Sequence, residues 1–191
     1  MEGGNAASAA KRTSQRIGAH HLFNKVTPVN AKFEVRLGTD TSRTIKNFVN
    51  DRSEGHKLLL VDSDGDVDGD ALAHLRSQGK ALHDGVSVAD VHLMTHSMET
   101  FREDRPPGGP WLVADSEGLS KTYPKLNAGK LPSGDLERCD RKAVQKALKS
   151  AIGKPYGKID GLAALRHLDP TVIAARCPAA KRFFERLKNA Q

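Results

Sequence analysis

Three stretches in the first hundred residues have the hydrophobic pattern of β-strands. Residues 58–61 are four consecutive apolar residues, a run too short for a helix and typical of a strand buried on both faces of a parallel sheet. Residues 89–94 form a second apolar run, and residues 31–37 alternate apolar and charged side chains, as in a half-buried strand. Helical patterns at 44–49 and 71–78 separate these strands. This order predicts an α/β fold with a mostly parallel sheet and helices on both faces.

Apolar residues at helical spacing follow in the second half of the chain, and one such segment precedes the strands. The early segment spans residues 6–23. The later ones span residues 111–123, 141–152, 160–168 and 179–187, and the segment 141–152 is clearly amphipathic. The second half is therefore expected to be entirely helical.

The length of 191 residues suits one domain with an appended part. We expect an α/β core over residues 1–118 and a helical C-terminal part over residues 119–191. No apolar run approaches the roughly 18 residues that cross a bilayer, and the N-terminus lacks the apolar core of a signal peptide. The two cysteines, Cys139 and Cys177, do not have zinc-site spacing and suggest a reducing compartment. These features predict a cytoplasmic protein without a membrane segment.

Charge is distributed unevenly along the chain. Residues 1–50 carry 8 basic and 3 acidic side chains, residues 51–140 carry 10 and 17, and residues 141–191 carry 12 and 3. An acidic centre between basic flanks suits a metal-dependent enzyme that acts on phosphodiesters, because carboxylates bind the metal and Lys and Arg bind phosphates. A solvated basic surface would give the same charge balance.

Five aspartates alternate over residues 62–70, directly after the first apolar strand. Carboxylates at the carboxyl end of a central strand lie where open α/β folds bind their ligands. Residues 64–69 match the opening of an EF-hand, but its closing acid would fall at Leu75. A haloacid-dehalogenase-type phosphatase would use Asp62 as nucleophile and Asp64 as acid/base, but no later acidic pair follows a strand. The last three aspartates are expected to be solvated or to cap the next helix.

A third interpretation pairs the Asp62-Ser63-Asp64 motif with Glu2-Gly3-Gly4 before the first helix. This pairing resembles the Toprim domain of topoisomerases, primases and overcoming-lysogeny-defect-type nucleases. Residues 92–99 (HLMTHSME) and 111–119 (WLVADSEGL) resemble the methionine-glutamate, tryptophan and alanine-aspartate signature of a family of small uncharacterised bacterial Toprim-like proteins. Further segments resemble that family's helical half: Leu131-Pro132, Leu136-Glu137, Ala147-Leu148-Lys149 and Tyr156-Gly157-Lys158.

The resemblance implies a metal site and a partner. Asp62 and Asp64 would bind Mg²⁺ or Mn²⁺, and Glu2 would be a further ligand or a general acid/base. Glu99 and Asp115 are additional candidates for the same pocket, with a helix-terminal charge or a structural hydrogen bond as the alternative for each. Family members are often encoded beside an ABC-type or SMC-like ATPase and are associated with phage defence.

The sequence departs from the family pattern in two places. The apolar strand that usually leads into the glutamate and glycines is missing before Glu2, so the sheet is expected to lack its first strand. Residues 100–110, rich in proline and glycine, separate Glu99 from Trp111, which are almost adjacent in the family. This insertion would form a loop over the site or change the position of Glu99 relative to Asp115.

A basic surface is expected near the C-terminus. Lys142, Lys146 and Lys149 share one face of the predicted helix 141–152, and Lys158 follows it. These lysines would bind a nucleic-acid backbone or an acidic partner. The histidines have no metal-ligand spacing on one helical face. No phosphate-binding Walker loop is present in the sequence, so the chain is not expected to be an ATPase itself.

These observations predict a Mg²⁺- or Mn²⁺-dependent Toprim-type nuclease, the effector subunit of an ATPase-linked anti-phage system. The alternatives are a non-catalytic Toprim-like subunit that docks on an ATPase or DNA, which the short N-terminus favours, and a haloacid-dehalogenase-type phosphatase.

Overall fold

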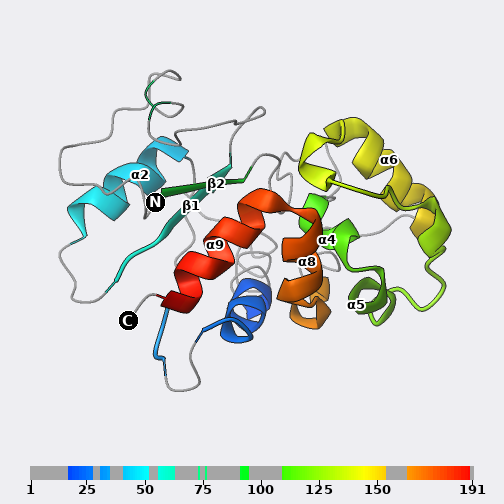
Figure 1. The fold of residues 1–191 in the computed structure, drawn as a ribbon, viewed down its shortest axis with the longest axis horizontal. Helices are drawn as coiled ribbons and strands as arrows, with labels where there is room; N and C mark the ends of the chain where they lie inside the picture. Colours follow the sequence, from blue (N-terminus) through cyan, green and yellow to red (C-terminus); the bar gives the residue numbers. More distant parts are fainter. Residues whose placement is uncertain are drawn as a thin grey trace, which may run out of the picture.

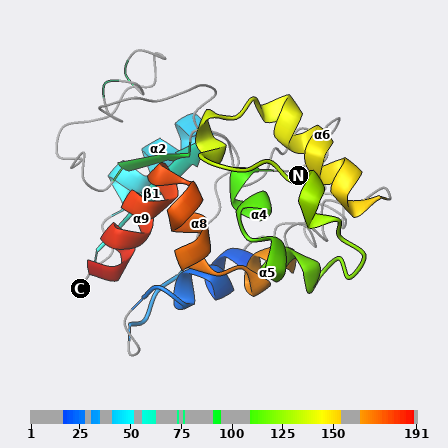
Figure 2. The ribbon, with the colours of Figure 1, turned by 45° about the vertical axis from the view of Figure 1, so that its right-hand side comes forward.

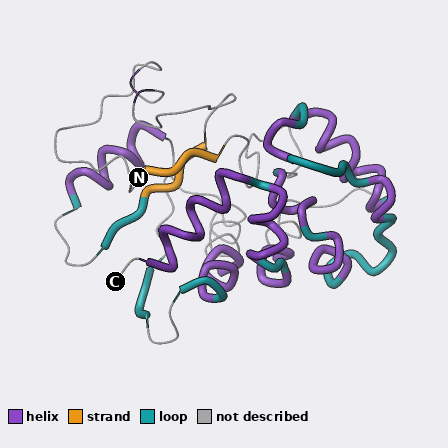
Figure 3. Tube along the Cα trace, viewed as in Figure 1, coloured by secondary structure: helices purple, strands orange, loops and turns teal. Residues whose placement is uncertain are grey.

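The fold is described from a computed structural model, which covers residues 17–27, 31–34, 41–51, 56–62, 73, 76, 91–94, 109–153 and 163–189. Helices dominate the described residues, and one small parallel sheet joins them (Figure 3). The protein is therefore α/β, with a smaller described sheet than the sequence suggests.

The sheet consists of β1 (Leu59–Asp62) and β2 (Val91–Met94). The two strands are parallel, and their register pairs Leu59 with Val91 and Asp62 with Met94. Leu59 and Val91 are buried, as expected for strands made of consecutive apolar residues. Both strands and their parallel arrangement confirm what the two apolar runs predict.

Helix α2 (Thr41–Asn50) contacts β1 and buries Ile45, and it is longer than the predicted helix 44–49. Residues 31–34 of the predicted strand 31–37 are irregular chain, so the expected strand is wrong over this part. The alternation survives nonetheless, because Phe33 packs against the core while Lys32 and Glu34 are exposed. The apolar pattern thus identified which side chains point inward. Among the described residues, however, this segment pairs with no neighbouring strand. Of the predicted helix 71–78, Ala73 and Arg76 are described, and both are helical.

Within residues 109–153 and 163–189, all regular elements are helices, as expected, although turns and loops make up much of residues 121–140. In Figures 1 and 2 the sheet lies on one side of the molecule and α6 on the other, with α4, α8 and α9 between them. The α-helices are α4 (Pro110–Ala114), α5 (Ser116–Ser120), α6 (Arg141–Ile152), α8 (Pro170–Arg176) and α9 (Pro178–Asn189). Three short 3-10 helices connect them: η2 (Ala128–Lys130), η3 (Leu136–Arg138) and η4 (Leu165–His167).

Helix α6 has the bounds that its amphipathic pattern predicts, with Asp140 as N-cap and Gly153 as C-cap. Gly153 has φ of 70°, a left-handed conformation that favours glycine after a helix. The predicted helix 111–123 is instead broken into α4 and α5. Asp115 causes the break, because its extended backbone ends α4 while its side chain caps α5.

One hydrophobic core joins the early helix, which is described over residues 17–24, to the second half of the chain. The ring of Phe23 meets Phe183 of α9 at a centroid distance of 5.2 Å, and Trp111 of α4 meets Phe184 at the same distance. Trp111 is 1% exposed. The expected boundary after residue 118 falls inside α5, which packs into this core through Leu119.

Arg176 connects three segments of the helical part. At the end of α8, its guanidinium donates to the carbonyl oxygens of Val113 (3.2 Å), Ala114 (2.8 Å) and Pro132. The carbonyls of Val113 and Ala114 are at the end of α4, and that of Pro132 is in the loop after η2. At such positions a carbonyl has no N–H partner within a helix. The five fixed N–H donors of arginine suit such a junction.

No helix in the described part of the chain is long and apolar enough to cross a membrane.

Candidate functional site

Asp62, the first candidate metal ligand, is the last residue of β1. It lies beside Met94, the last residue of β2, so the carboxyl ends of both parallel strands meet at one edge of the sheet. The chain that continues from these two ends carries Asp64 and Glu99. This edge, formed by the carboxyl ends of β1 and β2, is where open α/β sheets bind ligands.

The remaining acidic candidates are not placed by the structure. Glu2, Asp64 and Glu99 lie outside the described residues, as does the insertion 100–110, and of Asp62 the strand position alone is described. No group of three His, Cys, Asp or Glu side chains with metal-site geometry occurs within the described ranges. Carboxylate oxygens are ligands that suit Mg²⁺ or Mn²⁺. The predicted ligand set stays a prediction.

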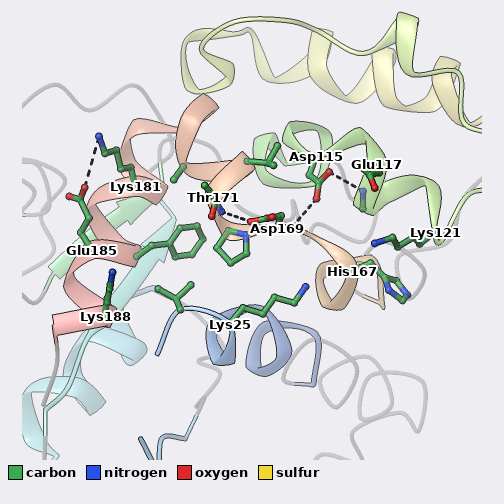
Figure 4. A pocket seen from close by; sticks show the side chains of 16 residues that line it. Lys25, Asp115, Glu117, Lys121, His167, Asp169, Thr171, Lys181, Glu185 and Lys188 are labelled. Carbon is green, nitrogen blue, oxygen red and sulfur yellow. Dashed lines mark hydrogen bonds and ion pairs between the residues drawn. The ribbon is translucent and has the colours of Figure 1, made fainter. Parts of the chain in front are cut away.

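Asp115, the aspartate of the alanine-aspartate signature, has a structural role. Its carboxylate is buried, with Oδ1 accepting from the Gly118 amide at 2.9 Å and Oδ2 accepting from the Asp169 amide at 2.8 Å. Asp169 in turn caps α8 by accepting from the Thr171 amide at 2.7 Å, as Figure 4 shows. Both oxygens of Asp115 thus join α5 to the start of α8, which is the structural alternative that the sequence left open.

Gly118 makes this junction possible. A Cβ at position 118 would lie 2.7 Å from the carbonyl oxygen of His167 and closer still to the carboxylate of Asp115. Any side chain would push α5 away from both partners. The glycine of the motif Ser116-Glu117-Gly118 is therefore required by close packing.

Glu137, another acidic residue of the resemblance, also binds backbone amides. It is 7% exposed, and its carboxylate accepts from the amides of Ala179 (2.7 Å) and Ala180 (3.3 Å) in the first turn of α9. Burial raises the pKa of Glu137 above its usual value, although these two hydrogen bonds lower it. Its position satisfies two amide groups that the first turn of a helix leaves without a helical partner.

The predicted basic surface is placed in part. Lys142, Lys146 and Lys149 are exposed on α6, opposite the buried Val144 and Leu148, so they form one stripe along the helix. Lys158 lies outside the described residues. Helix α6 is on the far side of the molecule from β1 (Figures 1 and 2). The stripe therefore lies at a distance from Asp62.

Both cysteines are free, and burial raises the pKa of the Cys177 thiol, so this side chain is an unreactive part of the core. His92 is in β2, with its ring 5.3 Å from that of Phe183. His92 therefore packs against an aromatic residue of the core.

No family model, curated protein or solved structure matches this chain. The relation to Toprim-like proteins therefore rests on the motifs quoted from the sequence.

Proposed function

We propose that the protein is a Mg²⁺- or Mn²⁺-dependent nuclease of the Toprim type, with Asp62 and Asp64 as metal ligands. The observation that carries the proposal is the position of Asp62 at the carboxyl end of β1, in parallel register with β2. Glu99 follows β2 along the chain, and Glu2 would complete the acidic set.

The proposed chemistry needs closely spaced carboxylates. Asp62 and Asp64 would bind the ion through oxygen atoms, and Glu2 would orient or deprotonate the attacking water. A divalent ion at such carboxylates supplies charge neutralisation for the phosphate and lowers the pKa of a bound water. Grouped carboxylates repel one another when no cation lies between them. The motif therefore suits cation binding better than it suits stabilisation of the fold.

The stripe on α6 supports a nucleic-acid substrate. Lys142, Lys146 and Lys149 are exposed and carry like charges along one line, as expected for contacts to successive phosphates. Because α6 lies away from β1, these contacts would anchor the nucleic acid at a distance from the cleaved bond. An ABC-type or SMC-like ATPase is the proposed partner, on the strength of the resemblance alone.

Cleavage of plasmid and single-stranded DNA tests the proposal, with Mg²⁺ or Mn²⁺ and with or without the protein encoded by the neighbouring gene. We expect Asp62→Asn and Asp64→Asn to lower the cleavage rate by about a thousandfold, as loss of a metal ligand does to metal-assisted hydrolysis. Asp68→Asn is the matched control, because it removes an equal charge from the same segment at a position expected to be solvated. Equal cleavage by all variants would refute the metal site.

A second result would separate the alternatives. Metal-dependent release of phosphate from p-nitrophenyl phosphate, without DNA cleavage, would support the phosphatase. DNA binding without cleavage under any condition would support the non-catalytic subunit.

Loss of the α6 stripe gives a further test. The triple change Lys142→Gln, Lys146→Gln and Lys149→Gln should reduce the slope of log K against log salt by about 2 to 3 for duplex DNA. Each phosphate contact that is lost means that about one counterion fewer is released on binding. A matched pair, Lys125→Gln and Lys130→Gln, alters exposed lysines outside the stripe. An unchanged slope in the triple variant would remove α6 from the nucleic-acid surface.

A further inference from the structure

A groove of about 650 Å³ lies between the helical segments of the protein. Its walls come from the end of the early helix, from α5, from η4 with the first part of α8, and from α9. None of its lining residues belongs to β1 or β2. Val26, Pro170 and Phe184 give it an apolar portion. The volume is in the range of small-molecule sites in proteins.

Four lysines and four carboxylates line this groove, and all of the carboxylates except that of Glu117 are engaged by other groups. Asp115 uses both oxygens on backbone amides, and Asp169 accepts from Thr171. The carboxylate oxygen Oε1 of Glu185 lies 4.0 Å from Nζ of Lys181. Among the described residues, no carboxylate forms an ion pair with Lys121 or Lys188, which also line the groove.

Lys25 is held in place at one end of the groove. Its Nζ donates to the carbonyl oxygens of Arg166 (2.9 Å) and Leu168 (2.7 Å), at the end of η4. An ammonium group has three N–H donors, so one remains for a further acceptor. Figure 4 shows Lys121 and His167 close together at the same end of the groove, with Lys25 extending toward them.

The field at this end is positive. Partial burial lowers the pKa of His167, and the nearby charges of Arg166, Lys121 and Lys25 lower it further. The acidic groups that line the same groove, among them Asp115, Glu117 and Asp169, do not offset this effect. His167 Nε2 accepts from Nε of Arg166 at 3.1 Å, and an imidazole that accepts at Nε2 carries its N–H on Nδ1.

We propose that this groove binds a terminal phosphate group at the end formed by Lys25, Lys121 and His167. A phosphate monoester carries nearly two negative charges and several acceptor oxygens, and these match a site with separate ammonium donors and an imidazole N–H. The apolar portion of the groove would contact the sugar or base. The phosphate belongs either to a free nucleotide or to the phosphorylated end of a nucleic-acid strand. This site is independent of Asp62 and of the proposed cleavage.

Calorimetric titration of the full chain tests the site, in EDTA so that a strand remains intact. The probes are AMP, adenosine, a 5′-phosphorylated thymidine oligonucleotide and the same strand with a 5′-hydroxyl. Tighter binding of AMP than adenosine identifies a free nucleotide as the source, and tighter binding of the phosphorylated strand than its hydroxyl form identifies a strand end. If the phosphate strengthens neither ligand, the proposal is refuted.

Two variants locate the phosphate. Lys121→Ala should weaken binding roughly tenfold, as loss of one charge-assisted hydrogen bond does. Lys125→Ala removes an exposed lysine four residues further on that does not line the groove, and it should leave the affinity unchanged. Equal losses in the two variants would show a general charge effect and overturn the assignment.

The titration of His167 by NMR gives a readout independent of affinity. Its resonance is identified by its absence in the His167→Asn variant. Bound phosphate should raise the pKa of His167, because a dianion favours the imidazolium form. An unchanged pKa at saturating ligand would place the phosphate elsewhere and refute the proposal.

Discussion

The acidic residues of the sheet edge and those of the helical part both belong to motifs of the Toprim-like resemblance, but they occupy different places in the fold. In the helical part, Asp115 and Glu137 are buried, and each carboxylate accepts hydrogen bonds from two backbone amides. At the sheet edge, Asp62 ends a parallel strand, and Asp64 follows it in the sequence. An acidic residue in a family motif can therefore serve the fold in one region and be a candidate for metal binding in another.

The difference concerns what each carboxylate does for stability. Two backbone amides at a helix start need acceptors, and Asp115 and Glu137 supply them where water does not reach. Asp62 and its neighbours, in contrast, are close in sequence and would repel one another. Variants of the two groups should therefore separate unfolding from loss of activity.

The largest expected effect on stability comes from Arg176, which holds the helical part together. Arg176→Ala should lower the free energy of unfolding by about 3 kcal/mol, because three carbonyls lose a charged donor. Arg176→Lys should recover only part of this loss, since one ammonium group cannot reach three carbonyls with the same geometry. Urea unfolding followed by circular dichroism measures both changes.

Arg138→Ala is the control for Arg176. Arg138 pairs with Asp135 at 3.4 Å, but its side chain is 82% exposed, and an exposed pair contributes little. If the two alanine variants were equally stable, Arg176 would not be the junction of the helical part.

Asp115→Ala should cost less, about 2 kcal/mol, because it leaves two backbone amides without their acceptor. Asp62→Asn should change the free energy of unfolding by less than about 0.5 kcal/mol while abolishing cleavage, as the proposed metal site requires. Urea unfolding gives the free energy of unfolding of both variants, and cleavage is assayed under conditions in which both are folded. Loss of cleavage in folded Asp115→Ala would mean that this residue belongs to the catalytic site.

The smallest effect is a pH dependence due to Glu137. Because its native pKa lies above 4.5, the native state binds this proton more tightly than the unfolded chain does. The resulting stabilisation is complete below the unfolded pKa and is lost as the pH rises through the native pKa. Relative to Glu137→Gln, the wild type should therefore become less stable as the pH rises from below the unfolded pKa through the native pKa.

Glu117→Gln is the control for this titration, because Glu117 is exposed. A Glu137→Gln difference that stayed constant over this pH range would show that burial does not govern this carboxylate.

Local patterns predicted several elements well. The apolar runs located β1 and β2, and the amphipathic spacing gave the bounds of α6. Helix α8 was missed because it has seven residues, too few for a clear period, although Asp169 and Pro170 are a recognisable helix start. The break between α4 and α5 was missed because apolar residues continue on both sides of Asp115.

By itself, the sequence determined the two buried strands, the helical second half and the exposed face of α6, because each depends on hydrophobic spacing within one segment. The parallel arrangement of the strands followed from the alternating order of strands and helices. The tertiary structure alone decided the roles of Asp115 and Glu137. Their partners, Asp169 and Ala179, lie 54 and 42 residues further along the chain, and no local pattern reports on contacts at that separation. The groove beside His167 has the same origin, since four separate segments enclose it.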